Sequence, residues 1–149
     1  MGPSAKKPVI FLIVISLGIV TLILASAVSE SSSAEFQHIS AGELKKLMES
    51  KKDFLLVDAQ PKGVYEMGHI KGAVNLPWAK EIKGPVKLPK NKLLVIYCDC
   101  SHEEDSIDLA SQLVENWDYK SGDIKLLTGG WSGWVKLGYP TQKSKVKGK

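Results

Sequence analysis

The chain has 149 residues, 24% of them charged and 44% hydrophobic, which is an ordinary composition for a globular domain. Apart from the histidines, every basic side chain is a lysine, because the sequence contains no arginine, and the formal net charge is +4. Arginine is the residue best suited to bidentate recognition of phosphates and carboxylates, so its absence excludes several designs of active site.

The first 28 residues are typical of an export signal. Lys6 and Lys7 form a positive start, residues 9–25 are apolar, and small residues at the end of this run fit a cleavage site. The apolar run is also just long enough to span a bilayer as a helix. Residues 1–28 are therefore predicted to be a signal peptide or an uncleaved transmembrane signal anchor, and the length of the run slightly favours the anchor.

This segment predicts where the rest of the chain is located. Lysines before the apolar run should stay inside, so the domain should be exported; in a bacterium it would lie in the periplasm or at the extracytoplasmic face of the inner membrane. A serine-rich linker, 29–36, would lead to a domain at 37–141 and a basic, disordered tail at 142–149. The tail lacks aromatic residues for base stacking, so we expect no nucleic-acid partner. The membrane is an expected partner if the helix is uncleaved.

Helix and strand patterns alternate along the domain. Ser40 and Glu43 have the spacing of a capping box. The apolar stripe of the helix that follows is Leu44, Leu47 and Met48. Short apolar runs predict strands at 53–59 (DFLLVDA), near 73–75, at 93–98 (LLVIYC) and within 123–130 (DIKLLTGG). A second helical stripe consists of Ile107, Leu109, Ala110, Leu113 and Val114. A short helix is predicted within 131–140, ended by Gly138 and Pro140.

This alternation predicts an α/β fold: a central parallel sheet with helices on both faces, preceded by the N-terminal apolar helix. In such sheets, ligands bind beyond the carboxyl ends of the strands. Cys98 ends the apolar run 93–98 and precedes a helix expected to begin near Asp105 or Ser106. The sequence therefore places a thiol where a functional site is expected.

Cys98 is the candidate nucleophile. The loop that follows it consists of Asp99, Cys100, Ser101, His102 and Glu103. This loop must turn tightly into the helix, so its backbone N–H groups would surround whatever the sulfur carries, and the helix amino terminus adds partial positive charge. Both effects favour the thiolate. A thiolate in a cradle of N–H donors is suited to accept a sulfane sulfur, to hold it as a persulfide and to pass it to a second nucleophile.

Three segments resemble signatures of the rhodanese family, in the family's order and spacing. They are LLVDAQPKGVYEMGHIKGAVNLPW at 55–78, with Gly-His-Ile-x-Gly-Ala-x-Asn-Leu-Pro after a strand and an Asp, LLVIYC at 93–98, and IKLLTGGWSGWVKLGYP at 124–140. The resemblance covers nearly all of residues 40–140. It implies a small three-layer rhodanese-like domain with a central parallel sheet, which needs no cofactor and in which Cys98 is the sulfur-carrying nucleophile.

The sequence departs from the family pattern close to this cysteine. Gln60 stands where members often have arginine, and Val64 where an acid is common. The loop after Cys98 has His102 as its only basic residue, where the family usually has glycine, a basic residue and serine or threonine. Acidic neighbours repel a thiosulfate dianion. We therefore expect a persulfide or polysulfide donor to be accepted more easily than thiosulfate.

The acidic run has a structural interpretation as well. The acids at 103–105 would lie in the first turn of a helix, where negative charge is favourable, and Ser101 and Glu104 have capping-box spacing. The related phosphatases and arsenate reductases use a cysteine followed by five residues and an arginine. Position 104 is Glu here, so this class is excluded.

Cys100 has three interpretations. It could be a resolving thiol that attacks an adduct on Cys98, it could be a loop residue without a chemical role, or it could bind a soft metal together with Cys98 and His102. Three ligands in one loop with no second cluster give a weak signal, so no metal site is predicted.

Other polar residues are expected to be structural. His69 should hydrogen-bond to the backbone and order its turn, and Asp58 should make a structural hydrogen bond at the end of its strand. His38 is placed in the linker and carries no signal. Gly129 and Gly130 are expected to allow a close approach of two backbones.

The resulting prediction is an exported sulfurtransferase that uses a small sulfane-sulfur donor and a thiol or similar acceptor, with Cys98 as the persulfide carrier. Two alternatives remain open. One is a thiol-disulfide redox protein that uses Cys98 and Cys100, and the other is a catalytically silent rhodanese-like binding module.

Overall fold

The computed structural model describes residues 35–50, 52–99 and 102–144, all of which belong to the compact unit Ala34–Lys149. The predicted signal or anchor at 1–28 lies outside the described residues. Within the described part of the chain, no helix is both long enough and apolar enough to cross a membrane.

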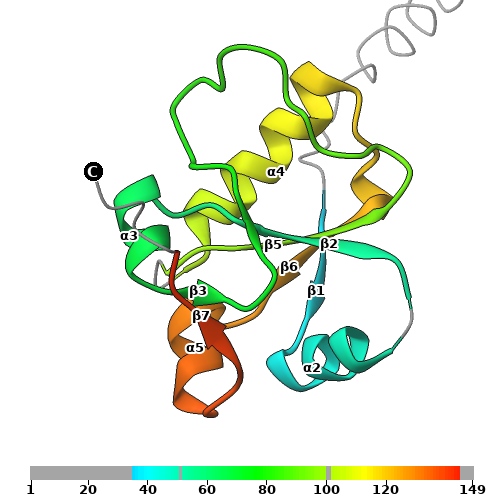
Figure 1. Ribbon diagram of the computed structural model, residues 1–149. Coiled ribbons are helices and arrows are strands. Elements are labelled where there is room, and N and C mark those ends of the chain that lie inside the picture. Colours follow the sequence, from blue (N-terminus) through cyan, green and yellow to red (C-terminus); the bar gives the residue numbers. More distant parts are fainter. Residues whose placement is uncertain (1–34, 51, 100–101, 145–149) are drawn as a thin grey trace, which may run out of the picture. The chain divides into compact units, whose positions relative to one another are not determined.

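The centre of the unit is a parallel sheet of five strands (Figure 1). In sheet order the strands are β1 (Gln37–Ile39), β6 (Ile124–Leu127), β5 (Leu93–Tyr97), β2 (Phe54–Asp58) and β4 (Val74–Asn75). All neighbouring pairs are parallel, and the longest register joins β2 to β5, from Phe54↔Leu93 to Asp58↔Tyr97. The carboxyl ends of the strands therefore meet at one edge of the sheet.

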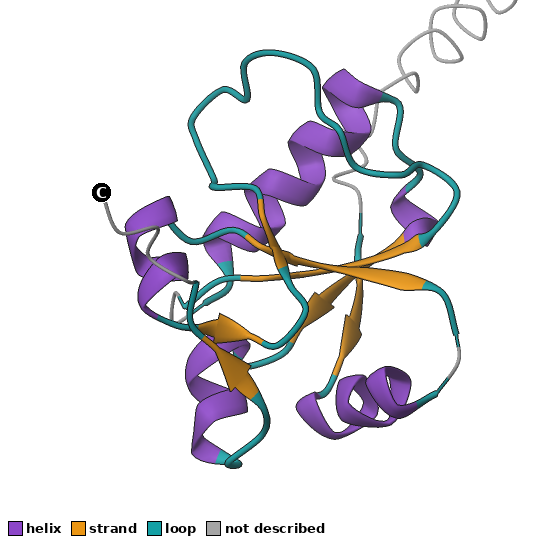
Figure 2. Ribbon diagram, in the orientation of Figure 1, coloured by secondary structure: helices purple, strands orange, loops and turns teal. Residues whose placement is uncertain are grey.

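Helices cover both faces of this sheet (Figure 2). One face is covered by α4 (Glu104–Trp117), and the other by α2 (Ala41–Glu49) and α5 (Gly130–Lys136). The unit also contains α3 (Lys62–Met67) and the 3₁₀ helix η2 (Ser121–Asp123). Side chains alternate across β5: Leu94 and Ile96 pack in the core that contains α4, whereas Val95 and Tyr97 pack in the core that contains α2 and α5. Because both faces are buried, the strand is a continuous apolar run rather than an alternating one.

A second, two-stranded sheet joins the chain's middle to its end. β3 (His69–Ile70) pairs antiparallel with β7 (Thr141–Gln142). The carbonyl oxygen of Pro140 accepts hydrogen bonds from the Lys71 N–H (3.2 Å) and from the Trp134 indole N–H (3.0 Å). These contacts fix the segment after α5 against the rest of the unit.

The structure confirms the predicted α/β architecture with helices on both faces. The capping box is present, with the Glu43 N–H donating to the Ser40 hydroxyl (3.2 Å) and the Ser40 N–H donating to the Glu43 carboxylate (2.9 Å). The predicted apolar stripe of α4 is wrong at one residue. Ile107 is 40% exposed, while Leu109, Ala110 and Leu113 are buried.

Candidate active site around Cys98

Cys98 directly follows β5, at the carboxyl end of the central strand, and its side chain is 1% exposed. Its Sγ lies 3.8 Å from the hydroxyl oxygen of Ser106, which is in the first turn of α4 and donates to the Glu103 carbonyl (2.8 Å). Cys98 is disulfide-bonded in the structure. The predicted loop residues Cys100 and Ser101 lie outside the described residues.

The backbone of Cys98 is held by the start of α5. The Cys98 carbonyl accepts a hydrogen bond from the Trp131 N–H (2.9 Å). Gly130 has φ +48°, and a Cβ at this position would lie 2.1 Å from the Cys98 carbonyl oxygen. No side chain fits in that space, so the expectation that this glycine permits a close backbone approach is confirmed.

Two acids of the loop also bind to the start of α5. The Asp99 Oδ1 accepts hydrogen bonds from the Ser132 N–H (3.0 Å) and hydroxyl (2.5 Å). The Glu103 Oε1 accepts one from the Gly129 N–H (3.0 Å). The first N–H groups of a helix lack partners within the helix, so these carboxylates complete α5. We call Asp99 and Glu103, together with Gly129 and Ser132, the loop clamp.

The loop clamp predicts a measurable effect of Asp99 on stability. Asp99→Ala should lower the free energy of unfolding by about 1 kcal/mol, because the Ser132 N–H and hydroxyl lose a charged acceptor at the protein surface. Asp99→Asn keeps an acceptor oxygen and should recover part of the loss. Urea unfolding measures both changes. Glu115→Ala, an exposed residue of α4, is the control, and an equal loss in that variant would show that the clamp contributes nothing.

The remaining acids belong to the start of α4. Glu104 and Asp105 occupy its first turn, as expected for negative charge near a helix amino terminus. The predicted capping box of Ser101 and Glu104 is wrong, because the N-cap is Glu103, which has φ 63° and makes no side-chain cap hydrogen bond. His102 is exposed, and its Nδ1 lies 3.3 Å from the Glu104 carboxylate.

His38 does not lie in a linker, as the sequence indicated, but in β1. Its Nε2 is 3.2 Å from the second carboxylate oxygen of Glu103. A three-residue strand gives almost no periodic signal, so the sequence could not show that His38 reaches the loop. His38 is thus a third residue, besides Gly129 and Ser132, that contacts the two acids of the loop clamp.

A buried polar network supports the site from the other face of the sheet. Asp58, at the end of β2, accepts hydrogen bonds from the Tyr97 hydroxyl (2.6 Å) and from the Gln60 N–H (2.8 Å). The Tyr97 oxygen in turn accepts from the Ile70 N–H (3.0 Å). Gln60 thus stands beside Asp58 and donates to it from its backbone. The prediction that Asp58 is a structural hydrogen-bonding residue agrees with these contacts.

His69 orders the turn before β3. Its Nδ1 is 2.8 Å from the Tyr65 carbonyl oxygen, and its ring stacks on the Tyr65 ring at a centroid distance of 3.8 Å. This is the backbone contact that the sequence predicted.

Burial raises the pKa of the Asp58 carboxyl, and the hydrogen bonds from Tyr97 and Gln60 offset this only in part. A raised pKa in the folded state means that Asp58 contributes most to stability below its unfolded pKa of about 3.9, and that this contribution is lost as the pH rises through the folded pKa. Asp58→Asn cannot ionise, so its stability relative to wild type should increase as the pH rises from about 4. Urea unfolding between pH 4 and pH 8 measures this difference, and parallel pH profiles would contradict it.

Among the described residues, no three histidine, cysteine, aspartate or glutamate side chains come together as a metal site. The predicted cradle of loop amides includes positions that the structure does not describe, so it stays a prediction.

The sequence was compared with known families and proteins. The model of the family described as "Rhodanese-like domain" matches residues 40–137. The thiosulfate sulfurtransferase GlpE of Coxiella burnetii is 33% identical over 107 residues, which cover 72% of this chain and 91% of that protein.

Solved structures agree with this fold. The rhodanese-like domain of the Anabaena protein Alr3790 superposes with a TM-score of 0.58 at 22% identity, covering 77% of this chain and 87% of that one. The thiosulfate sulfurtransferase of Pseudomonas aeruginosa gives 0.60 at 21% identity, covering 73% of this chain and 20% of that one. At such identities these structures support the fold alone.

Proposed function

Because this chain belongs to the rhodanese-like domain family, we propose that it is a sulfurtransferase that carries sulfane sulfur as a persulfide on Cys98. The observation that carries the proposal is the position of Cys98 at the carboxyl end of the central strand, with its carbonyl held by α5 and its Sγ beside the first turn of α4. A thiolate there would lie at the positive end of the helix dipole.

The proposed cycle begins with reduction of the Cys98 disulfide by two molecules of an external thiol, which join as a disulfide while Cys98 and its partner sulfur become thiols. The Cys98 thiolate attacks the outer sulfur of a persulfide, R–S–S⁻, forming the S–S bond of a Cys98 persulfide and releasing the thiolate R–S⁻. A second thiolate, R′–S⁻, then attacks the outer sulfur of this persulfide, taking it as R′–S–S⁻ and restoring the Cys98 thiolate. The number of electrons is conserved in each transfer, so the cycle needs no cofactor.

We propose a persulfide or polysulfide rather than thiosulfate as the preferred donor. The relative from Coxiella is named for thiosulfate. In this chain, however, the loop and the first turn of α4 contain Asp99, Glu103, Glu104 and Asp105 but neither lysine nor arginine. The carboxylates of Asp99 and Glu103 are turned to the start of α5, which offsets part of their charge. Glu104 and Asp105 would still repel a dianion.

Repulsion of thiosulfate by these acids predicts that the activity increases with salt. The kcat/KM for thiosulfate should rise several-fold between about 0.01 M and 0.5 M salt, because added ions screen the repulsion. The value for a singly charged persulfide donor should change less. Steady-state assays at several salt concentrations measure how kcat/KM changes with salt for each donor. A falling kcat/KM for thiosulfate with added salt would show that the site attracts the dianion.

Intact-mass spectrometry tests the proposed function directly. The reduced full-length chain, freed of reductant, is treated with thiosulfate or with polysulfide and weighed. One added sulfur, about 32 Da, that is absent when Cys98 is replaced by serine is the expected result. Polysulfide should give the larger fraction of adduct. Absence of the adduct with every sulfane donor would refute the proposal and leave a binding module as the better interpretation.

A second function, thiol-disulfide exchange, is favoured by one observation: Cys98 is disulfide-bonded in the structure. In this case Cys100 acts as the resolving thiol, and turnover oxidises both cysteines while a disulfide substrate is reduced to two thiols. Cys100→Ser should then abolish turnover. Reduction of the disulfide substrate at the wild-type rate in this variant would refute the redox function.

We also propose that the domain works outside the cytoplasmic membrane, either tethered or released. The support is the sequence of residues 1–28, with two lysines before an apolar run. Protease treatment of intact bacterial cells and of spheroplasts that express the chain tests this location. Digestion in spheroplasts but not in intact cells is the expected result, and protection in both would refute it.

A further inference from the structure

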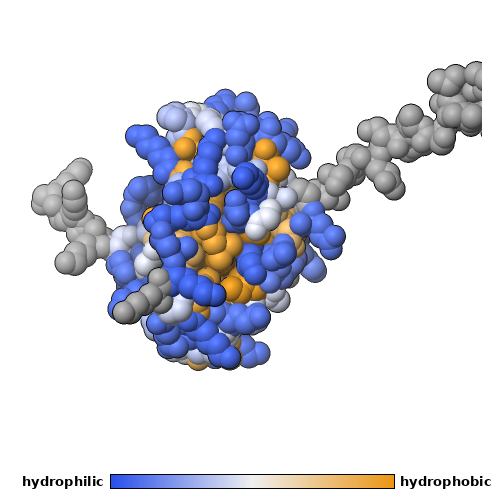
Figure 3. Space-filling view, turned by 90° about the vertical axis from the view of Figure 1, so that its right-hand side faces the viewer, coloured by the Kyte–Doolittle hydropathy of each residue, from blue (hydrophilic) through white to orange (hydrophobic). Residues whose placement is uncertain are grey.

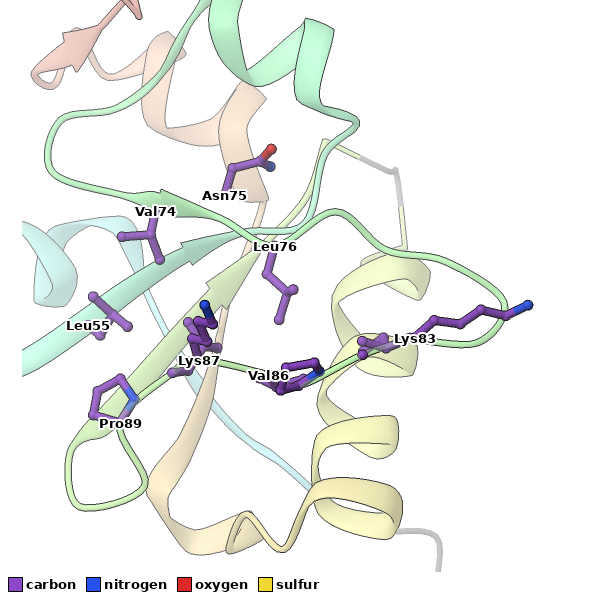
Figure 4. Close-up of a pocket in the computed structure, with 12 residues that line it drawn as sticks. Leu55, Val74, Asn75, Leu76, Lys83, Val86, Lys87 and Pro89 are labelled. Carbon is purple, nitrogen blue, oxygen red and sulfur yellow. The ribbon is translucent and has the colours of Figure 1, made fainter.

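An apolar pocket lies at the β4 edge of the sheet, and the proposed sulfur transfer does not use it. Its volume of about 530 Å³ is within the usual range for small-molecule sites. Residues of β2 and β4 form one wall, and the segment 82–89 passes over them (Figure 4). The apolar side chains that line it are Leu55, Val74, Leu76, Ile82, Val86 and Leu88.

Hydrogen bonds from α4 and from the residues after it hold the segment 82–89 in place. Gln112, buried on α4, donates from its side-chain nitrogen to the Ala79 carbonyl (2.8 Å) and accepts from the Ile82 N–H (2.9 Å). At the far end, the Tyr119 hydroxyl donates to the Leu88 carbonyl (2.6 Å). The segment is thus tied down on both sides of the pocket, which makes the pocket a fixed part of the fold.

The side chains inside the pocket offer a ligand few hydrogen bonds. Asn75 is the only uncharged polar side chain that lines it. Its Nδ2 already donates to the Asp58 carbonyl (3.0 Å) and to the Gln60 carbonyl (2.8 Å). The part of a ligand that lies against these side chains is therefore expected to be apolar.

Two lysines stand at the rim of the pocket. Lys83 and Lys87 are exposed, and neither forms an ion pair with any residue that the structure describes. Lys90 and Lys92, further along the chain, are instead near Asp118 (3.7 Å) and Asp53 (2.8 Å). In Figure 4 the Lys87 side chain lies among the apolar side chains, whereas that of Lys83 extends away from them. Unpaired lysines above an apolar interior match a negatively charged head group on an apolar chain.

The apolar surface continues beyond the pocket. A neighbouring depression, lined by Met48, Phe54 and Leu56, shares Leu55 with it. Figure 3 shows one face of the molecule, on which an apolar area is framed by hydrophilic residues. Contiguous apolar surface of this kind is a common mark of a binding site.

We propose that the pocket binds a single-chain anionic amphiphile. Its apolar chain lies under residues 82–89, and its head group, a carboxylate or a phosphate, pairs with Lys87, while Lys83 adds a second positive charge on the same segment. This site is separate from Cys98 and is not part of the proposed sulfur transfer.

Photolabelling of the full-length chain tests the proposal. The probe is dodecanoate with a diazirine in its chain, and labelled peptides are identified by mass spectrometry. We expect the label on peptides that cover 74–89. Excess dodecanoate or dodecyl phosphate should suppress it, and dodecanol should compete at least about tenfold less well, since it forms no ion pairs.

Variants separate the head-group site from general loss of structure. Lys83→Gln together with Lys87→Gln should reduce labelling about tenfold, while the matched control, Lys120→Gln with Lys136→Gln, removes the same charge from two other exposed lysines and should leave it unchanged. Val86→Asp should abolish labelling and leave sulfur transfer intact. Label spread evenly along the chain, label confined to residues 9–25, or equal labelling of the two lysine pairs would overturn the proposal.

Discussion

Replacing Cys98 with serine is expected to lower the rate of sulfur transfer by about a thousandfold or more. A serine hydroxyl cannot hold a sulfane sulfur as a persulfide, so the covalent route is lost altogether rather than slowed. The side chain is fully buried and serine is close to it in size, so the fold should be retained. Steady-state transfer from polysulfide to a thiol, with a parallel intact-mass measurement of the sulfur adduct, gives both the rate and the carrier.

The control for this variant is Cys100→Ser, which removes the chain's other cysteine. Wild-type transfer in Cys100→Ser together with no transfer in Cys98→Ser assigns the carrier to position 98. The opposite pattern would move the persulfide to Cys100, and an adduct in both variants would show that neither cysteine is required alone.

Replacing Gly130 with alanine is expected to have the largest effect on stability, a loss of about 3 kcal/mol or more. The backbone at this position is left-handed, which costs a residue with a Cβ about 1–2 kcal/mol. The new Cβ would also lie 2.1 Å from the Cys98 carbonyl oxygen, so one of the two backbones must move. Any movement breaks the hydrogen bond from Trp131 and displaces the nucleophile, so sulfur transfer should fall as well.

Gly133→Ala is the matched control, because Gly133 lies in the same helix. Its Cβ would meet nothing closer than the Thr128 carbonyl oxygen at 3.9 Å. Alanine is the better helix former by up to about 1 kcal/mol, so this variant should be as stable as wild type or more stable. Thermal and urea unfolding compare the two variants. Equal stabilities would show that the contact between Gly130 and Cys98 tolerates a side chain.

Most of the sheet could be predicted from the sequence, because its central strands are uninterrupted apolar runs. Residues 54–58 and 93–97 are buried on both faces, and the order of apolar runs and helical stripes determines a parallel sheet. β1, β3 and β7 were not predicted. They have two or three residues each, too few for any periodic pattern, and each forms only because a partner strand from a distant part of the chain lies beside it.

The candidate site was predictable in part for the same reason. Cys98 follows a long strand, so its place at the carboxyl edge could be inferred. The loop clamp could not, since Asp99 meets Ser132 and Glu103 meets Gly129 across 33 and 26 positions of sequence. Acidic residues near a cysteine indicated repulsion of a substrate, whereas two of them bind the amide groups of a neighbouring helix. Only the tertiary structure distinguishes these uses of a carboxylate.

The position of β1 has a consequence for the order of folding. β1 is the first strand in the sequence, but it pairs only with β6, the last strand of the sheet, with Gln37 opposite Lys125. A chain that leaves the ribosome from its amino end cannot complete this sheet until residue 127 has emerged. β2 and β5 can pair earlier, but β1 has no partner strand until nearly the whole domain has been synthesised. For a protein exported as we propose, this delay keeps the nascent chain unfolded while it reaches the membrane.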